Sequence, residues 1–426
     1  MSTPLAQPLP PVPALSGRSL FITGLGIGQI CSWGSLYYSF PLIAEAMGRD
    51  LGWSKPELYG AVSLGLAFGG LAAFPVGAAI DRGFGRLVMA AGSALAGLAL
   101  VAWSQVQHMG AFYVLVAAIG AFQAATLYEP AFAVVARRAG TAGARPGITA
   151  LTLWGGFAST VFIPLIQMLL VSVGWRGALL VLGAVNLLLC APLYAVVIRP
   201  AADREPAHAQ GLPLAGAGSA RQVMARVARL PTFWALAFAF TAYAAVHSAF
   251  SFHLFPLLLE QGFDATQVVS AMALIGPAQV AGRIAVSVFA PRAPVRFIGS
   301  CSMLAFPLAV AALAFLPLSF TLVACVAVLY GAANGVMTIV RGLAVPEMVT
   351  RHAYGAVNGA LATPGMVARA VAPAGTALLW AQSQSYGPVL AAMVAGGVLL
   401  CLAFWAAAFL SRRGGYGFVA VKVLPG

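Results

Sequence analysis

Charged side chains are scarce in this sequence, and acidic ones are the scarcest. Only 8% of its 426 residues are charged, with 10 Asp and Glu against 23 Lys and Arg. Soluble globular domains carry about 25% charged residues, so the sequence does not describe one. Hydrophobic residues make up 61% of the chain instead, and the mean hydropathy is +0.93. This composition predicts an all-helical integral membrane protein with many crossings.

Patterns typical of enzymes and of metal or nucleotide sites are also missing. The sequence has no Gly-rich nucleotide loop, no paired acids and no Ser, His and Asp that assemble into a triad. The five cysteines lie inside apolar runs without metal-ligand spacing, so packing is their expected role and a disulfide framework is not expected. We therefore expect no enzyme, no direct drive by ATP, and neither a cofactor nor a metal.

The excess of basic residues follows one side of the expected topology. Most Lys and Arg fall on alternate loops, whereas the loops between them hold Arg49, Lys55 and Arg176. Because basic loops mark the cytoplasmic side of a bilayer, both termini are predicted to be cytoplasmic, in a bacterial-style inner (plasma) membrane. The net charge of +13 is thus a consequence of topology and does not indicate nucleic-acid binding.

Apolar runs long enough to span a bilayer, about 20 residues each, recur along the whole chain. We count twelve, six on either side of a polar, basic cytoplasmic linker at 199–230. A shift of 211 residues lays Arg18 on Arg229 and Asp81 on Arg292, which favours two six-helix repeats with a site between them. The predicted parts are a disordered cytoplasmic tail at 1–18, bundles at 19–198 and 231–411, and a cytoplasmic tail at 412–426. The spans are expected near 19–44, 57–80, 87–105, 110–136, 147–172, 177–198, 231–257, 267–290, 297–316, 319–345, 355–382 and 388–411.

A charged hairpin joins the second and third expected spans. Its arginines alone would fit a generic basic loop. A generic basic loop does not explain the glycine one turn before Asp81. Such a glycine lets a neighbouring helix approach closely, so that the carboxylate of Asp81 can accept a hydrogen bond from that helix's N-terminus or from an arginine. The hairpin reads Gly77-Ala-Ala-Ile-Asp81-Arg82-Gly83-Phe84-Gly85-Arg86.

This hairpin resembles the signature loop Gly-x-x-x-Asp-Arg-x-Gly-Arg of the major facilitator superfamily, with one extra residue before Gly85. The resemblance implies twelve transmembrane helices in two six-helix halves. It also implies a lock at the cytoplasmic side while the protein faces outward. The residues that would form this gating motif are Gly77, Asp81, Arg82, Gly85 and Arg86.

Four ionisable side chains fall at membrane depth, where a charge is costly and therefore a candidate for function. Arg283 lies in the eighth expected span and Arg369 near the middle of the eleventh. No acid lies deep in the second half to neutralise them, so a substrate anion held by the guanidinium forks would serve as their partner. The alternative is that both arginines bind helix C-termini, backbone carbonyls or Glu129 and hold the fold. Arg341 lies nearer the surface, where snorkelling explains it as well as a site role does.

The two deep arginines carry a closer resemblance. Gly282-Arg283 and the segment around Arg369 look like matching positions of the oxalate–formate antiporters and the monocarboxylate transporters, which place an arginine in the eighth helix. The oxalate type adds a lysine where this chain has Arg369. The monocarboxylate type has an aspartate one turn before the first arginine, where this chain has Gln279. The resemblance implies a small mono- or dicarboxylate gripped between Arg283 and Arg369.

Aromatic and acidic residues complete the candidate site. Trp33 and Tyr37 share one face of the first span, and Tyr330 lies among small and polar residues of the tenth. Such rings offer an apolar wall with a polar tip, although ordinary packing would also explain each of them. Glu129 is the acid inside the fourth span. It is a candidate for coupling transport to protons, or a charge partner of nearby arginines.

The sequence thus predicts a monomeric secondary transporter that moves a small organic anion across the bilayer by alternating access, by symport or antiport. A rival within the same superfamily is a proton-coupled exporter of drugs or metabolites. The fifth span lacks that group's Gly-Pro pair, since Gly155-Gly156 is followed by Phe157. The rival outside the superfamily is a membrane receptor that binds a ligand without moving it, which would be expected to carry a signalling domain.

Overall fold

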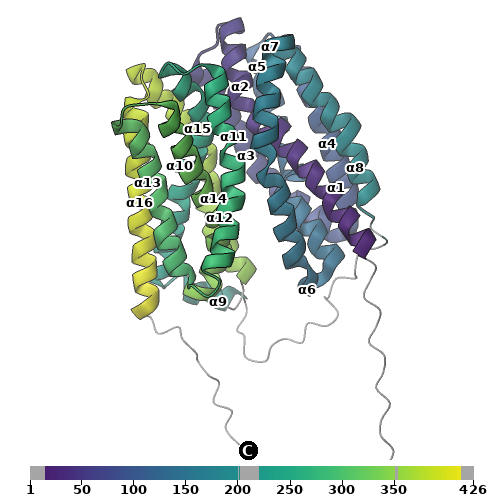
Figure 1. Ribbon diagram of the computed structural model, residues 1–426. Helices are drawn as coiled ribbons and strands as arrows, with labels where there is room; N and C mark the ends of the chain where they lie inside the picture. Colours follow the sequence, from purple (N-terminus) through teal and green to yellow (C-terminus); the bar gives the residue numbers. More distant parts are fainter. Residues whose placement is uncertain (1–14, 200, 202–219, 351–353, 414–426) are drawn as a thin grey trace, which may run out of the picture.

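The computed structural model describes residues 15–199, 201, 220–350 and 354–413, and its regular structure is helical throughout these ranges. Helix covers each of the twelve expected spans. Most of the two predicted tails and most of the linker lie outside the described residues. The first half of the chain, purple to teal in Figure 1, and the second half, green to yellow, form two bundles that stand side by side.

Interruptions divide several of the long helices into shorter elements. π-helical turns at Gly34–Tyr38 and Val185–Cys190 lie inside the first and sixth spans, and a third lies at Ile80–Phe84. The elements of the first half are α1 (Leu15–Trp33), α2 (Ser39–Leu51), α3 (Lys55–Ala79), α4 (Gly85–Trp103), α5 (Met109–Thr126), α6 (Tyr128–Gly156), α7 (Ala158–Ala184) and α8 (Ala191–Val197). Those that follow are α9 (Ala220–Val227), α10 (Pro231–Glu260), α11 (Ala265–Ala273), α12 (Ile275–Phe289), α13 (Val295–Phe315), α14 (Phe320–Met348), α15 (Tyr354–Ser383) and α16 (Gly387–Arg413).

Eight helical stretches among the described residues are long and apolar enough to cross a bilayer. Two of them, Lys55–Trp103 and Pro146–Val197, contain 49 and 52 residues, about twice what one crossing needs. Each reverses at a glycine with positive φ, Gly83 at 97° and Gly174 at 69°, where the absence of a Cβ removes the steric penalty that L-residues meet. Each stretch is therefore a helical hairpin. The expected first and eleventh spans are helical as well but are not among the eight.

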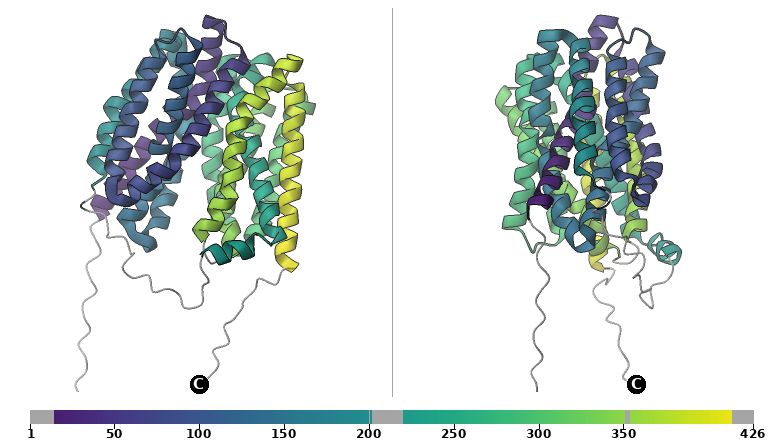
Figure 2. Two further views of the ribbon diagram at one scale, coloured as in Figure 1. Left: turned by 180° about the vertical axis from the view of Figure 1, so that it is seen from behind. Right: turned by 90° about the vertical axis from the view of Figure 1, so that its right-hand side faces the viewer.

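The two halves meet at one end of the molecule and diverge toward the other. We call the end with α9 and the hairpin at Gly83 the linker end, and the opposite end the far end. Close to the far end, Tyr59 on α3 donates a hydrogen bond of 3.0 Å to the carbonyl of Phe252 on α10. Nearby, Ser63 accepts one of 3.0 Å from the backbone N–H of Ala374 on α15. The helices of the two halves separate toward the linker end (Figures 1 and 2), so the structure is closed at the far end.

Candidate functional site

Arg369 lies in α15 between Pro364 and Pro373 and faces the first half of the chain. Its guanidinium carbon is 5.4 Å from the centre of the Tyr37 ring, in the π-helical turn of the first span. The Nε atom is buried without a hydrogen-bond partner among the described residues. The described part of the chain also has no carboxylate within ion-pair distance of this guanidinium. Arg369 is therefore a deep cation that lies on an aromatic ring and forms no ion pair with a carboxylate of the described residues.

Arg283 on α12 is held differently. The side chain is 8% exposed. Its Nη1 donates a hydrogen bond of 2.7 Å to the carbonyl of Thr152, and its Nε donates one of 3.3 Å to the carbonyl of Gly335. Thr152 belongs to α6 in the first half, so Arg283 links the two halves near the middle of the molecule. These contacts match the backbone-carbonyl alternative raised from the sequence, and they leave part of the fork free.

The break between α5 and α6 determines where Glu129 lies in the structure. Pro130 has no N–H, so it cannot donate to the carbonyl of Thr126 four residues earlier. The Nε2 of Gln29 on α1 donates to that carbonyl instead, at 2.8 Å. Leu127 between the two helices has an extended ψ of −153°. As a result Glu129 stands in the first turn of α6, where its side chain is exposed.

Glu129 and Arg369 line one cavity of about 170 Å³. Its walls come from α3, α5, α6 and α15, so it lies between the two halves. The remaining lining residues are small or apolar apart from Gln123. The carboxylate of Glu129 and the guanidinium of Arg369 form no ion pair in the described structure. Arg283 does not line this cavity.

The predicted aromatic residues divide into two groups. The ring centre of Trp33 lies 5.3 Å from that of Tyr37 and 5.0 Å from that of Tyr128, so Trp33 adjoins the ring beneath Arg369. The Nε1 of Trp33 is buried and has no hydrogen-bond partner within the described ranges. Tyr330 is only 1% exposed and stacks on Phe250 with ring centres 3.9 Å apart.

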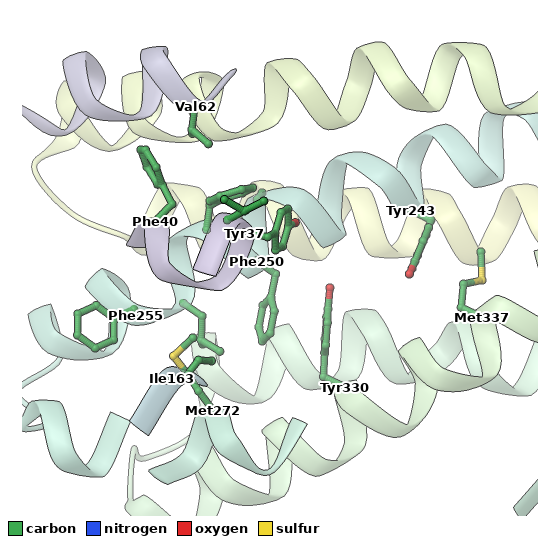
Figure 3. Packing of buried hydrophobic residues seen from close by; sticks show 14 of the residues in the cluster. Tyr37, Phe40, Val62, Ile163, Tyr243, Phe250, Phe255, Met272, Tyr330 and Met337 are labelled. Carbon is green, nitrogen blue, oxygen red and sulfur yellow. The ribbon is translucent and has the colours of Figure 1, made fainter. Parts of the chain in front are cut away.

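Tyr330 belongs to a polar and aromatic cluster of the second half. Its hydroxyl lies 3.2 Å from Nδ1 of His247, and the hydroxyl of Tyr243 donates to Oδ1 of Asn334. Figure 3 shows the hydroxyl ends of Tyr243 and Tyr330 pointing into the same space, with Phe250 beside Tyr330. The structure thus brings Trp33 and Tyr37 close to Arg369 and places Tyr330 in this neighbouring cluster. Arg341, further along α14, is exposed.

The gating motif forms the tight reversal between α3 and α4. Arg137 donates a hydrogen bond from Nη1 to the backbone carbonyl of Asp81, and Gly85 is buried where a Cβ would lie 2.8 Å from Val134. Asp81, Arg82 and Arg86 are exposed, and the carboxylate of Asp81 has no hydrogen bond or ion pair in the described chain. A Cβ on Gly77 would meet nothing within 4 Å. The helix face that the motif was expected to present to a neighbour is therefore open in this structure.

A cluster at the far end was not predicted from the sequence, which suggested only surface charges. Lys55 of α3 lies 3.5 Å from Oε2 of Glu260 on α10 and 3.9 Å from the centre of the Trp380 ring on α15. Trp380 donates to the same oxygen at 2.7 Å, and the backbone N–H of Tyr386 donates to Oε1 at 3.2 Å. These residues are distant in sequence, so only the folded chain brings them together. We call them the far-end latch.

Comparisons with known proteins agree with this architecture. The sequence profile of the Major Facilitator Superfamily matches residues 25–373. The human protein named Monocarboxylate transporter 11 is 32% identical over 211 residues, which make up 47% of this chain but only 42% of that protein. The rat protein named Monocarboxylate transporter 13 is 26% identical over 338 residues, or 78% of this chain and 73% of that protein.

Two solved structures have the same fold. A bacterial homolog of the human lysosomal transporter Spinster, in an inward-facing and unoccupied conformation, superposes with a TM-score of 0.70 at 15% identity. The match covers 94% of this chain and 98% of that one. The nucleoside transporter NupG superposes with a TM-score of 0.70 at 15% identity, over 92% of this chain and 99% of that one. At these identities the likeness concerns the fold alone.

Proposed function

Because this chain belongs to the Major Facilitator Superfamily, we propose that it is a secondary transporter that moves a small organic anion, a mono- or dicarboxylate, by alternating access. The observation that carries the proposal is Arg369, a deep cation that lines a cavity between the halves and has no carboxylate partner among the described residues. A guanidinium fork suits a carboxylate. The names of the mammalian relatives point to the same substrate class.

The transport cycle would use the two bundles, 19–198 and 231–411, as rocking units around this cavity. The structure is closed at the far end, so the substrate would reach Arg369 from the linker end. Arg283 would bind the anion as the halves close on it, because its link to the Thr152 carbonyl joins the two bundles. The path of the substrate would be lined by Trp33, Tyr37 and Tyr330. The gating motif at Asp81 would close the linker end.

The same proposal assigns the sides of the membrane. The hairpins at the linker end carry the basic loops, so this end would face the cytoplasm of a cell with the protein in its inner membrane. The sequence favours a monomer. Glu129 would be the group through which protons are coupled, unless it contacts the substrate itself.

The test is uptake into proteoliposomes across a panel of labelled carboxylates: formate, lactate, pyruvate, oxalate and succinate, with and without an inward proton gradient. Saturable uptake of at least one of them is expected, with a loss of at least tenfold in Arg369→Gln. The matched control is Arg292→Gln, which removes an exposed arginine at the linker end and should leave uptake unchanged. Absence of any carboxylate uptake by correctly folded protein would instead favour the proton-coupled exporter of drugs or metabolites.

A further inference from the structure

The cavity between the halves carries two opposite charges that do not pair. Arg369 enters it from α15 in the second half and Glu129 from the first turn of α6 in the first half. Elsewhere in the described chain, opposite charges that come close do form ion pairs, as Glu45 and Arg49 do at 3.6 Å. Glu129 and Arg369, by contrast, form no ion pair within 4.0 Å in the described chain although both line this cavity. Two unpaired opposite charges therefore line one cavity that a ligand can fill.

The charges restrict what that ligand can be. A monocarboxylate would neutralise Arg369 and leave Glu129 without a partner. A dicarboxylate would bring a second negative charge toward Glu129. Once the linker end closes and water leaves the cavity, both arrangements are strongly destabilised by the unpaired negative charge unless Glu129 takes up a proton. A ligand with one negative and one positive group satisfies both side chains at once.

The volume and the lining residues of the cavity indicate what the rest of the ligand can be. Its volume is about 170 Å³, and an engineered protein cavity of about 150 Å³ holds a benzene molecule. Gly70, Ala73 and Gly77 of α3 line it, as do the apolar side chains of Leu127 and Met366. A Cβ built on Gly70 or Gly77 would meet nothing within 4 Å, so this part of the lining leaves room for an apolar group.

We propose that the substrate is a zwitterionic α-amino acid with a small or medium-sized apolar side chain. Its carboxylate binds Arg369, its ammonium group binds Glu129, and its side chain lies against the glycine face of α3. This inference rests on the proposed transport function and changes only the substrate class. It also gives Glu129 a role in recognition in place of proton coupling.

The experiment compares leucine with 4-methylpentanoate, which is the same molecule without the amino group. Purified protein in proteoliposomes should take up leucine in a saturable manner and at least tenfold better than 4-methylpentanoate. Glu129→Gln should lower the ratio of the two uptake rates at least tenfold, because it removes the partner of the ammonium group. Glu45→Gln, which removes a carboxylate from a partly exposed ion pair of the same half outside this cavity, should leave that ratio unchanged.

Two outcomes would overturn the inference, and they can be told apart. If 4-methylpentanoate enters as well as leucine and Glu129→Gln slows both equally, the zwitterion is wrong while the carboxylate transporter stands. If neither these compounds nor the simple carboxylates enter, the transport proposal itself fails. Because Glu129 has no hydrogen bond or ion pair to lose in the described chain, gel filtration of Glu129→Gln should match that of the wild type and exclude misfolding.

Discussion

The two deep arginines show how the same side chain can take different roles at the same depth. Arg369 has a ring beneath it and an unpartnered Nε, whereas Arg283 has two backbone carbonyls as acceptors. Both were candidates from the sequence, because a charge at membrane depth stands out in a chain this apolar. Which acceptors each of them finds depends on helices far away in sequence, so that part could not be predicted.

A comparison of substitutions at Arg283 and at Thr152 can separate the hydrogen bond to the Thr152 backbone from any role of the Thr152 side chain. Arg283→Gln removes one charged donor from the Thr152 carbonyl and one from the Gly335 carbonyl, which still accepts from the Thr338 hydroxyl; a hydrogen bond to a charged group contributes about 1.5–3 kcal/mol. We expect the midpoint of thermal unfolding in detergent to fall by a few degrees and uptake to fall at least tenfold. Thr152→Ala keeps the backbone carbonyl and should behave like the wild type. Equal loss in both variants would show that the contact across the halves is not what matters.

At the scale of elements, the positions of the helices could be predicted because the bilayer fixes their length. The breaks within them were harder to place. The end of α5 coincides with no glycine, and the signal lies four residues further on, in Pro130, whose missing N–H frees the carbonyl of Thr126. The partner of that carbonyl, Gln29, is 97 residues away in the sequence. A pattern within one span cannot indicate such a contact. The contact nevertheless supports the break that determines where Glu129 lies.

This break can be tested with a pair of substitutions. Gln29→Leu removes the donor to the Thr126 carbonyl and should destabilise the protein by about 1–3 kcal/mol, measured as a lower midpoint of thermal unfolding. Pro130→Ala restores an N–H that can bind the same carbonyl. In the Gln29→Leu background it should therefore recover part of the loss, as a double-mutant cycle would reveal. Additive effects of the two substitutions would contradict the shared acceptor.

On the scale of the whole molecule, the sequence predicts the parts of the candidate site better than their assembly. Arg369, Glu129, Trp33 and Tyr37 stand out individually as rare charges or as rings beside small residues. The cavity that Arg369 and Glu129 share forms only where α3, α5, α6 and α15 pack around it, and Tyr37 reaches Arg369 from outside that lining. The far-end latch is similar, because Lys55 and Glu260 read as surface charges until the two halves are brought together. A contact between the two halves leaves no pattern in any one stretch of the sequence, whereas a single rare charge or ring can be recognised where it stands.

The two ends of the molecule should act in opposition, and this can be measured. Lys55→Met breaks the latch that holds the far end closed. A partly exposed pair of this kind contributes about 1 kcal/mol, so the population should shift about fivefold toward a state open at the far end. Asp81→Asn weakens the contact that the gating motif would make with a helix N-terminus when the linker end closes, worth about 0.3–1 kcal/mol. It should shift the population toward the conformation described here.

Spin labels on the exposed positions Val196 and Phe297, one in each half near the linker end, would report both shifts in protein whose native cysteines have been replaced. Lys55→Met should increase the fraction with a short distance between the labels, and Asp81→Asn should decrease it. The two sites lie at opposite ends and share no partner, so their free-energy changes should add, and the double variant should return toward the wild-type distribution. A double variant that resembles either single variant would mean that the ends are not coupled through one rocking motion of the halves.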